Sequence, residues 1–192
     1  MTRLVLLGPP GAGKGTQAQR LSERLGVPAV STGDIFRSNV AQGTELGREA
    51  QSYMEAGEYV PDSVTNRMVA DRLTQADCSG GFLLDGYPRT AAQVVELDRV
   101  LAADGHRLDA VLELVVADTE EVVSRLRKRA VTEGRSDDTE DVIRRRLEVY
   151  AEQTAPLTDL YRERGLLVQV DGTGDVDEVT SRILTALDER TA

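Results

Sequence analysis

The chain reads Gly8-Pro9-Pro10-Gly11-Ala12-Gly13-Lys14-Gly15-Thr16 directly after a short apolar run, Leu4–Leu7, and before a stretch in which apolar residues recur at helical spacing. A strand, a glycine-rich loop and a helix in this order are the context of a phosphate-binding loop. Glycines permit positive φ angles, so successive N–H groups can point inward and form an anion site at a helix N-terminus. The segment therefore predicts a phosphate site in which Lys14 reaches the β and γ phosphates.

One position departs from the strict loop pattern. That pattern places Ser or Thr directly after the lysine, whereas here Gly15 intervenes and the hydroxyl group belongs to Thr16. This Gly-Lys-Gly-Thr form resembles the loop of nucleoside monophosphate kinases. The resemblance implies that magnesium is held largely by phosphates and water.

Short apolar runs bounded by Gly, Pro or Asp recur along the chain and are typical of buried strands. They are Leu4–Leu7, Ala29-Val30, Phe82–Leu84, Val111–Val116 and Leu166–Val170. Longer stretches with helical spacing separate them, for example Ala18, Leu21 and Leu25. Strands that alternate with helices indicate an α/β fold, in which helices cover both faces of a parallel sheet. We expect a P-loop fold with a five-stranded parallel sheet.

Two segments interrupt the alternation. Residues 31–76 hold only helical patterns, with Gly43, Gly47 and Gly57 as breaks and Pro61-Asp62-Ser63 as a helix start, and we expect residues 31–60 to form an insertion over a ligand. Polar residues 129–138 should form a short mobile lid, because one helix is expected to end near Arg129. The core of this single domain (1–192) then comprises residues 1–30, 61–128 and 139–192. Pro156 predicts a kink or a break in its helix.

Composition narrows the classes of partner. The chain has 192 residues, of which 40% are hydrophobic and 29% charged, and no apolar run approaches the ~20 residues of a membrane span. With no secretory signal, a soluble cytoplasmic protein is expected. The net charge of −10 argues against long nucleic acid as a partner, although arginines bunch between residues 125 and 146. The single cysteine, Cys78, excludes an internal disulfide and a multi-cysteine zinc site.

Beyond the loop, the chain resembles adenylate kinase from end to end, in the form with a short lid. The motifs that carry the resemblance are Ser31-Thr32-Gly33-Asp34 with Arg37, Gly57-Glu58-Tyr59-Val60-Pro61, Phe82-Leu83-Leu84-Asp85-Gly86-Tyr87-Pro88-Arg89 with Gln93, Gly134-Arg135-Ser136-Asp137-Asp138 with Arg146, and Val170-Asp171-Gly172-Thr173-Gly174. The lid lacks cysteines, so the zinc-binding long-lid form is excluded.

The resemblance implies two nucleotide pockets. The ATP pocket would comprise Gly11, Ala12, Gly13, Lys14, Gly15, Thr16, Arg129 and Gly174. The AMP pocket would comprise Thr32, Arg37, Glu58, Tyr59, Val60, Gly86, Tyr87, Pro88, Arg89, Gln93, Arg135 and Arg146. The catalytic groups would be Lys14, Arg89, Arg129, Arg135 and Arg146, and Asp85 and Asp34 would hold magnesium through water.

Several of these roles also make physical sense without the resemblance. Asp85 ends a predicted strand at the carboxyl edge of the sheet, where ligands bind in such folds, although a capping role is the alternative for both Asp85 and Asp34. Gln93 lies four residues after Arg89, and its amide can both donate to and accept from a base edge. An arginine is usually a solvated surface charge. The resemblance therefore selects five arginines among many, namely Arg37, Arg89, Arg129, Arg135 and Arg146.

Phosphoryl transfer between two nucleotides requires positioning and charge stabilisation rather than a protein nucleophile. The expected reaction is reversible transfer from MgATP to AMP, giving two ADP, by a monomeric enzyme. Two alternatives stay open. The first is a UMP/CMP kinase of the same family, which Thr32 disfavours because those relatives commonly place Ala at this position. The second is a nucleotide-binding module without catalytic activity.

Overall fold

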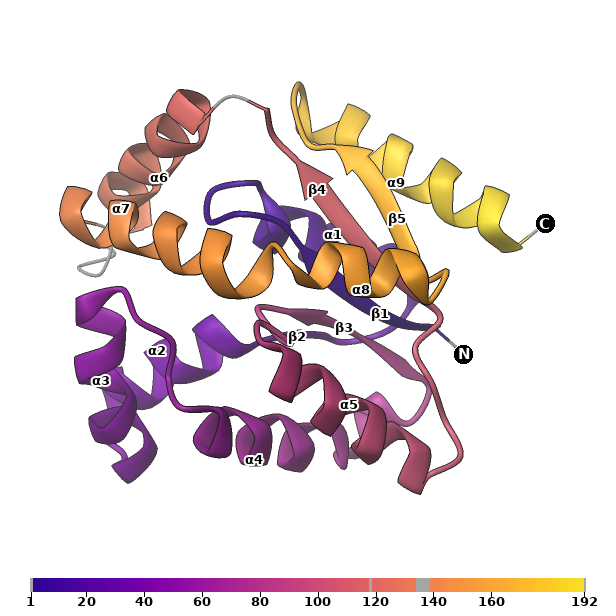
Figure 1. The fold of residues 1–192 in the computed structure, drawn as a ribbon, viewed down its shortest axis with the longest axis horizontal. Coiled ribbons are helices and arrows are strands. Elements are labelled where there is room, and N and C mark those ends of the chain that lie inside the picture. The colour runs from indigo at the N-terminus through magenta and orange to yellow at the C-terminus, as the bar shows by residue number, and fades with distance from the viewer. Residues whose placement is uncertain (1, 118, 134–138, 192) are drawn as a thin grey trace.

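A parallel sheet forms the centre of the molecule. The structure is a computed structural model that describes residues 2–117, 119–133 and 139–191. Its sheet has the strand order β2-β3-β1-β4-β5, with all neighbouring pairs parallel (Figure 1). The strands are β1 (Thr2–Leu7), β2 (Ala29–Ser31), β3 (Gly81–Asp85), β4 (Ala110–Val115) and β5 (Leu167–Asp171). The α/β fold with a five-stranded parallel sheet is confirmed.

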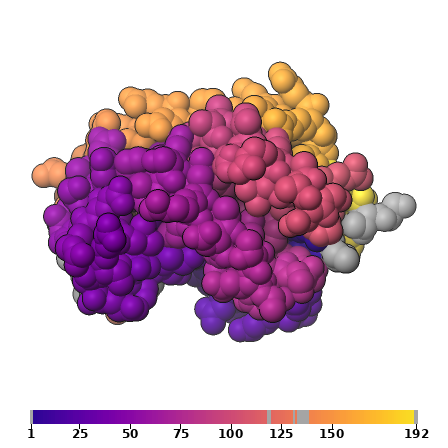
Figure 2. Space-filling model, turned by 90° about the horizontal axis from the view of Figure 1, so that it is seen from below, coloured from indigo at the N-terminus to yellow at the C-terminus, as the bar shows by residue number. Residues whose placement is uncertain are grey.

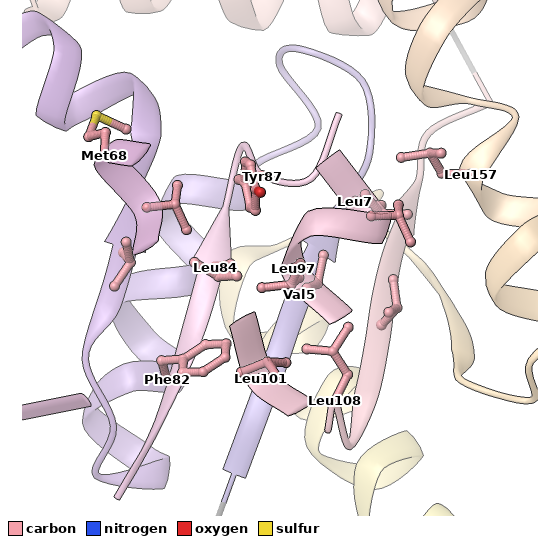
Figure 3. Packing of buried hydrophobic residues seen from close by; sticks show 14 of the residues in the cluster. Val5, Leu7, Met68, Phe82, Leu84, Tyr87, Leu97, Leu101, Leu108 and Leu157 are labelled. Atoms are coloured by element: carbon pink, nitrogen blue, oxygen red, sulfur yellow. The ribbon is translucent and has the colours of Figure 1, made fainter. Parts of the chain in front are cut away.

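Helices cover both faces of the sheet, and the central strand β1 is therefore apolar on both sides. Val5 and Leu7 of β1 belong to one buried cluster, while Leu4 and Leu6 belong to another on the opposite face. The first cluster takes in residues of α4 (Asp62–Leu73), α5 (Ala91–Ala103) and α8 (Leu157–Glu163), and the second those of α1 (Lys14–Leu25) and α9 (Val176–Thr191). Figure 3 shows the first cluster, including Val5, Leu7, Phe82, Leu84, Leu97 and Leu101.

The predicted insertion, residues 31–60, contains α2 (Thr32–Gln42) and α3 (Glu45–Ala56). Gly43 and Gly57 end these helices with positive φ angles, as the sequence predicts. The prediction of a break at Gly47 is wrong, because this residue lies inside α3. A Cβ atom there would stand 2.2 Å from the Asn39 carbonyl oxygen, so glycine is required for α3 to pack closely on α2.

Helices α6 (Thr119–Glu133) and α7 (Glu140–Val149), which follow β4, lie at the same end of the molecule as α2 and α3 (Figure 1). Helix α6 continues four residues past the predicted end near Arg129, and residues 134–138 of the predicted lid lie outside the described residues. Helix α7 is followed by a π-helical turn, η2 (Tyr150–Thr154). As predicted, Pro156 divides the helix, since α8 starts only at Leu157.

The insertion lies against α7. The α3 and α7 helices are in contact, and in Figure 2 the purple residues of α2 and α3 form a lobe beside orange residues from the later part of the chain. Glu58, just after α3, forms an ion pair with Arg145 of α7 at 2.7 Å. The insertion is therefore held to a segment that lies nearly 90 residues later in the chain.

Two further features are the environment of the single cysteine, Cys78, and the character of the helices with respect to a membrane. Cys78 lies in a short 3₁₀ helix, η1 (Ala76–Cys78), where it is buried, and burial raises the pKa of its thiol. Its thiol accepts a hydrogen bond from Arg72 at 3.0 Å. None of the helices in the described ranges combines the length and the apolar character that crossing a bilayer requires.

Candidate functional site

A cavity of about 780 Å³ lies at the carboxyl ends of β1, β2 and β3. Its walls come from the loop between β1 and α1, from the insertion, from the residues after β3, and from α6, α7 and η2. Ligands of open α/β sheets bind at this edge. The fold thus joins both predicted pockets in one continuous space.

The predicted phosphate loop forms one wall of this cavity. Gly11 and Gly13 adopt positive φ angles of 84° and 92°, and Gly13 is the residue that precedes α1. A Cβ atom on Gly11 would stand 2.8 Å from the Val122 carbonyl oxygen, so the loop can rest on α6 only because this residue is glycine. All the predicted ATP-binding residues line the cavity, namely Gly11, Ala12, Gly13, Lys14, Gly15, Thr16, Arg129 and Gly174.

Lys14 curls back over the loop. Its ammonium donates hydrogen bonds to the carbonyl oxygens of Gly8 and Pro9, at 2.7 and 3.0 Å. Burial lowers the pKa of this ammonium from 10.5 to about 8; Asp85 opposes the shift, whereas Arg89 and Arg129 add to it. A cation held by carbonyl oxygens among other cations is suited to an anionic ligand, which would relieve that repulsion.

The opposite wall carries the predicted acceptor side. Thr32 is buried, and its hydroxyl donates to the Gly86 carbonyl oxygen at 2.9 Å. Gln93 is also buried; its Oε1 accepts from the Arg89 N–H at 2.7 Å and its Nε2 donates to Asp62 at 2.8 Å. The Gln93 amide is thus oriented by the protein and keeps one N–H and one lone pair for a ligand.

Four of the five arginines chosen from the sequence with Lys14 border this one cavity. Arg37 comes from α2, Arg89 from the loop after β3, Arg129 from α6 and Arg146 from α7. Arg135 lies outside the described residues. Guanidinium groups that converge from four separate elements form a strongly positive site inside an acidic chain, which suits several phosphate groups.

Three predicted residues have other surroundings than expected. Tyr87 does not line the cavity: its ring is buried in the core, and its hydroxyl donates to Asn66 at 2.8 Å. Burial raises the pKa of that hydroxyl. Glu58 lines the cavity but pairs with Arg145. Asp34 is exposed and pairs with Arg37 in the first turn of α2. The remaining predicted AMP-pocket residues among those described, Thr32, Arg37, Tyr59, Val60, Gly86, Pro88, Arg89, Gln93 and Arg146, do line it.

Asp85 faces the phosphate loop. Its Oδ2 lies 3.8 Å from the position of a Cβ atom on Gly15, and its charge acts on Lys14. In the described part of the chain, no three His, Cys, Asp or Glu side chains gather as a metal site would require. One carboxylate beside a phosphate site nevertheless fits a magnesium ion that keeps most of its waters and takes its other ligands from phosphates.

The structure also adds cavity residues that sequence reasoning missed. Arg125 lies one helical turn before Arg129, and its guanidinium donates to the Gly172 carbonyl oxygen at 3.3 Å. Its spacing of four residues from Arg129 could have revealed it, because such residues share a helix face. No such signal marks Tyr150 and Thr154, because their position depends on a π-helical turn. The others include Gln17, Phe36, Met54, Thr65, Lys128, Thr132, Val176 and Val179.

Comparison with known proteins agrees with this geometry. A family model described as adenylate kinase matches residues 6–166. The chain is 66% identical over 188 residues to the adenylate kinase of Kocuria rhizophila, which covers 98% of this chain and the whole of that protein. It is 63% identical to the adenylate kinase of a Nocardioides species, over 97% of each chain, and 60% identical to that of Thermobifida fusca, over 98% of this chain and 99% of the relative.

Proposed function

This chain belongs to the adenylate kinase family, and we propose that it catalyses reversible transfer of the terminal phosphoryl group of MgATP to AMP, giving two ADP. The observation that carries this proposal is the single cavity that joins the phosphate loop to the wall formed by Thr32, Arg89 and Gln93. Two nucleotides that enter from its two ends would meet at their phosphates.

The arginines and Lys14 supply the charge that this reaction needs. Lys14 binds the β and γ phosphates of ATP, and Arg129 also binds the ATP phosphates. Arg37 and Arg89 bind the AMP phosphate. Arg146 contributes from the lid side, as does Arg135 by the resemblance alone. Because the AMP phosphate is already anionic, no protein base is needed, and the transfer proceeds in line without a covalent intermediate. These groups stabilise the negative charge spread over the transferred phosphoryl group.

Magnesium enters the proposal as the ion that accompanies ATP. When bound, it neutralises charge on the phosphate oxygens. Asp85 would hold its waters; Asp34, which is exposed and paired with Arg37, is less well placed for this. We further propose that the chain acts as a monomer in the cytoplasm, maintaining the balance of adenine nucleotides, with ATP, AMP and ADP as its small-molecule partners.

The proposal is tested by incubating the protein with MgATP and AMP and measuring ADP. Two ADP should form for each AMP consumed, and the reverse reaction should start from ADP alone. The matched variant Lys14→Met should lose this activity because it lacks the ammonium. Tight binding of a bisubstrate dinucleotide without ADP formation would contradict the proposal and favour a nucleotide-binding module instead.

A further inference from the structure

We propose that Thr154 is a positioning residue for the acceptor side of the reaction. Its hydroxyl group, together with that of Tyr59, holds Arg89 in the orientation in which this arginine meets the acceptor phosphate. The inference rests on the proposed function, since Arg89 binds the AMP phosphate there. It assigns a role to a residue that has no signal in the sequence.

The main chain of Arg89 is held on both sides. Its N–H donates to Gln93 Oε1 at 2.7 Å, and its carbonyl oxygen accepts from the Thr154 hydroxyl at 2.9 Å. Its side-chain Nε donates to the Gly86 carbonyl oxygen at 2.8 Å. Within the described part of the chain, its two terminal nitrogens donate no hydrogen bond. They are the donors that an incoming phosphate can use.

The direction of the hydroxyl chain follows from the number of protons. The Thr154 and Tyr59 hydroxyl oxygens lie 2.7 Å apart, and either could donate on distance alone. Thr154 has one hydroxyl proton and gives it to the Arg89 carbonyl oxygen. Tyr59 must therefore donate to Thr154. Replacing Thr154 removes both hydrogen bonds, whereas replacing the Tyr59 hydroxyl removes only the bond that it donates to Thr154.

The Tyr59 ring closes the arrangement. The Arg89 guanidinium carbon lies 4.9 Å from the centre of this ring, a distance at which a cation is attracted to the π face. Tyr59 thus contacts the Arg89 side chain through its ring and the Arg89 main chain through Thr154. The three residues come from the end of the insertion, from η2 and from the loop after β3.

The π-helical turn explains why Thr154 reaches this position. The Ala155 N–H bonds to the Tyr150 carbonyl oxygen at 2.9 Å, five residues back, and Pro156 has no N–H to continue a regular helix. The widened turn places both Tyr150 and Thr154 on the cavity wall, with Thr154 only 4% exposed. A buried hydroxyl with both partners fixed is a rigid support.

The test uses variants that remove one hydroxyl and keep the shape. Thr154→Val should lower kcat/KM for AMP by about tenfold, and Tyr59→Phe by about threefold because its ring remains, while KM for ATP changes by less than about twofold. Thr154→Ser should restore most of the loss. Tyr59→Phe also keeps the test decisive if Thr154→Val does not fold, because it removes the hydrogen bond that fixes the Thr154 hydroxyl.

A matched control and a double variant separate positioning from stability. Thr158→Val also removes a buried hydroxyl, one turn later, where it donates to Glu113 at 2.7 Å outside the cavity, and AMP kinetics should not change. In an Arg89→Ala background, Thr154→Val should cause no further loss. An equal further loss in that background, or equal losses for AMP and ATP, would overturn the inference. Failure of the wild-type protein to phosphorylate AMP would instead overturn the proposed function.

Discussion

At the residue scale, the Lys14 ammonium should make ATP binding depend on pH. Its pKa of about 8 means that the proton is lost above this pH in the nucleotide-free protein. Bound phosphates favour the charged form and raise the pKa again, so binding takes up a proton. The affinity for ATP should fall by up to about tenfold for each pH unit above 8. Calorimetry between pH 8 and 9.5, in buffers of different ionisation enthalpy, measures both effects.

The control for this prediction is Lys14→Arg, whose side chain stays charged at every pH used. ATP binding to this variant should take up no proton above pH 8. Its catalytic activity should also fall despite the preserved charge, because a guanidinium cannot take the place of a compact ammonium under the loop. Wild-type binding that neither weakens nor takes up protons above pH 8 would contradict the assigned environment of Lys14.

The Arg89 side chain gives a second residue-scale prediction. Arg89→Ala should lower kcat with AMP by about 100-fold or more, because it removes a cation from the site of transfer. The fold should stay intact, since this guanidinium lies on the cavity wall rather than in the core. The measurement is steady-state kinetics together with a thermal melt. The matched control is Arg99→Ala on α5, where an exposed arginine pairs with Glu96 away from the cavity; activity there should be unchanged.

Some site residues could be predicted from the sequence, and others could not. Some motifs indicate nucleotide binding from their residue types alone, and the structure places their residues around one cavity: the phosphate loop, Thr32, Arg89 and Gln93. Tyr87 lies in the same motif, but its ring points into the core. A linear motif specifies the path of the main chain, whereas side-chain direction depends on the elements packed around it.

At the scale of elements, the contact between the insertion and α7 should affect AMP binding. Glu58 and Arg145 form the ion pair across it, with both side chains between a third and two fifths exposed. Such a pair contributes at most about 1 kcal/mol and is screened by salt. Single charge reversals, Glu58→Arg or Arg145→Glu, should therefore raise KM for AMP by a few-fold at low salt.

The double reversal of Glu58 and Arg145 is the control for this prediction, because it restores an attractive pair. It should bring KM for AMP back towards the wild-type value, and the differences among all four proteins should shrink in high salt. If the double reversal is as impaired as the two single variants combined, the ion pair does not couple the insertion to α7.

The ends of helices were predictable only where a residue's own backbone preferences start or end the helix. Gly43 and Gly57 end helices, and Pro61-Asp62-Ser63 starts one, because each residue has a local conformational reason. Gly47 was misread because its reason is close packing against α2, which is a tertiary cause. In the sequence, Gly134 directly follows the end of α6 at Glu133 and is a helix-stop residue, but the polar composition of residues 130–133 favoured a lid over a helix.

At the scale of the whole molecule, the sheet could be predicted from its short apolar runs. The central strands β1 and β3 are buried on both faces, and the sequence therefore shows them as continuous apolar segments. The order β2-β3-β1-β4-β5 could not be read, because it depends on how the intervening helices cross the sheet. That order nevertheless places Asp85 and the phosphate loop side by side at one edge, since β3 pairs with β1.

One cavity for two nucleotides also predicts a stability effect. A bisubstrate dinucleotide at 100 times its Kd should stabilise the folded state by about 2.7 kcal/mol. For a chain of this length, that corresponds to a rise in melting temperature of about 5–10 °C. Thermal melts with the dinucleotide, with ATP alone and with AMP alone provide the measurement. A dinucleotide shift no larger than that of ATP at the same concentration would contradict a cavity that holds both.

The choice of acceptor tests the central claim most directly. A coupled assay offers AMP, CMP, UMP and GMP separately, each with MgATP, at the same concentration. The wall of Thr32 and Gln93 should select AMP, so its rate should exceed the others by at least about tenfold, as one or two base-specific contacts would provide. Rates with UMP or CMP equal to the rate with AMP would contradict the account and favour a UMP/CMP kinase.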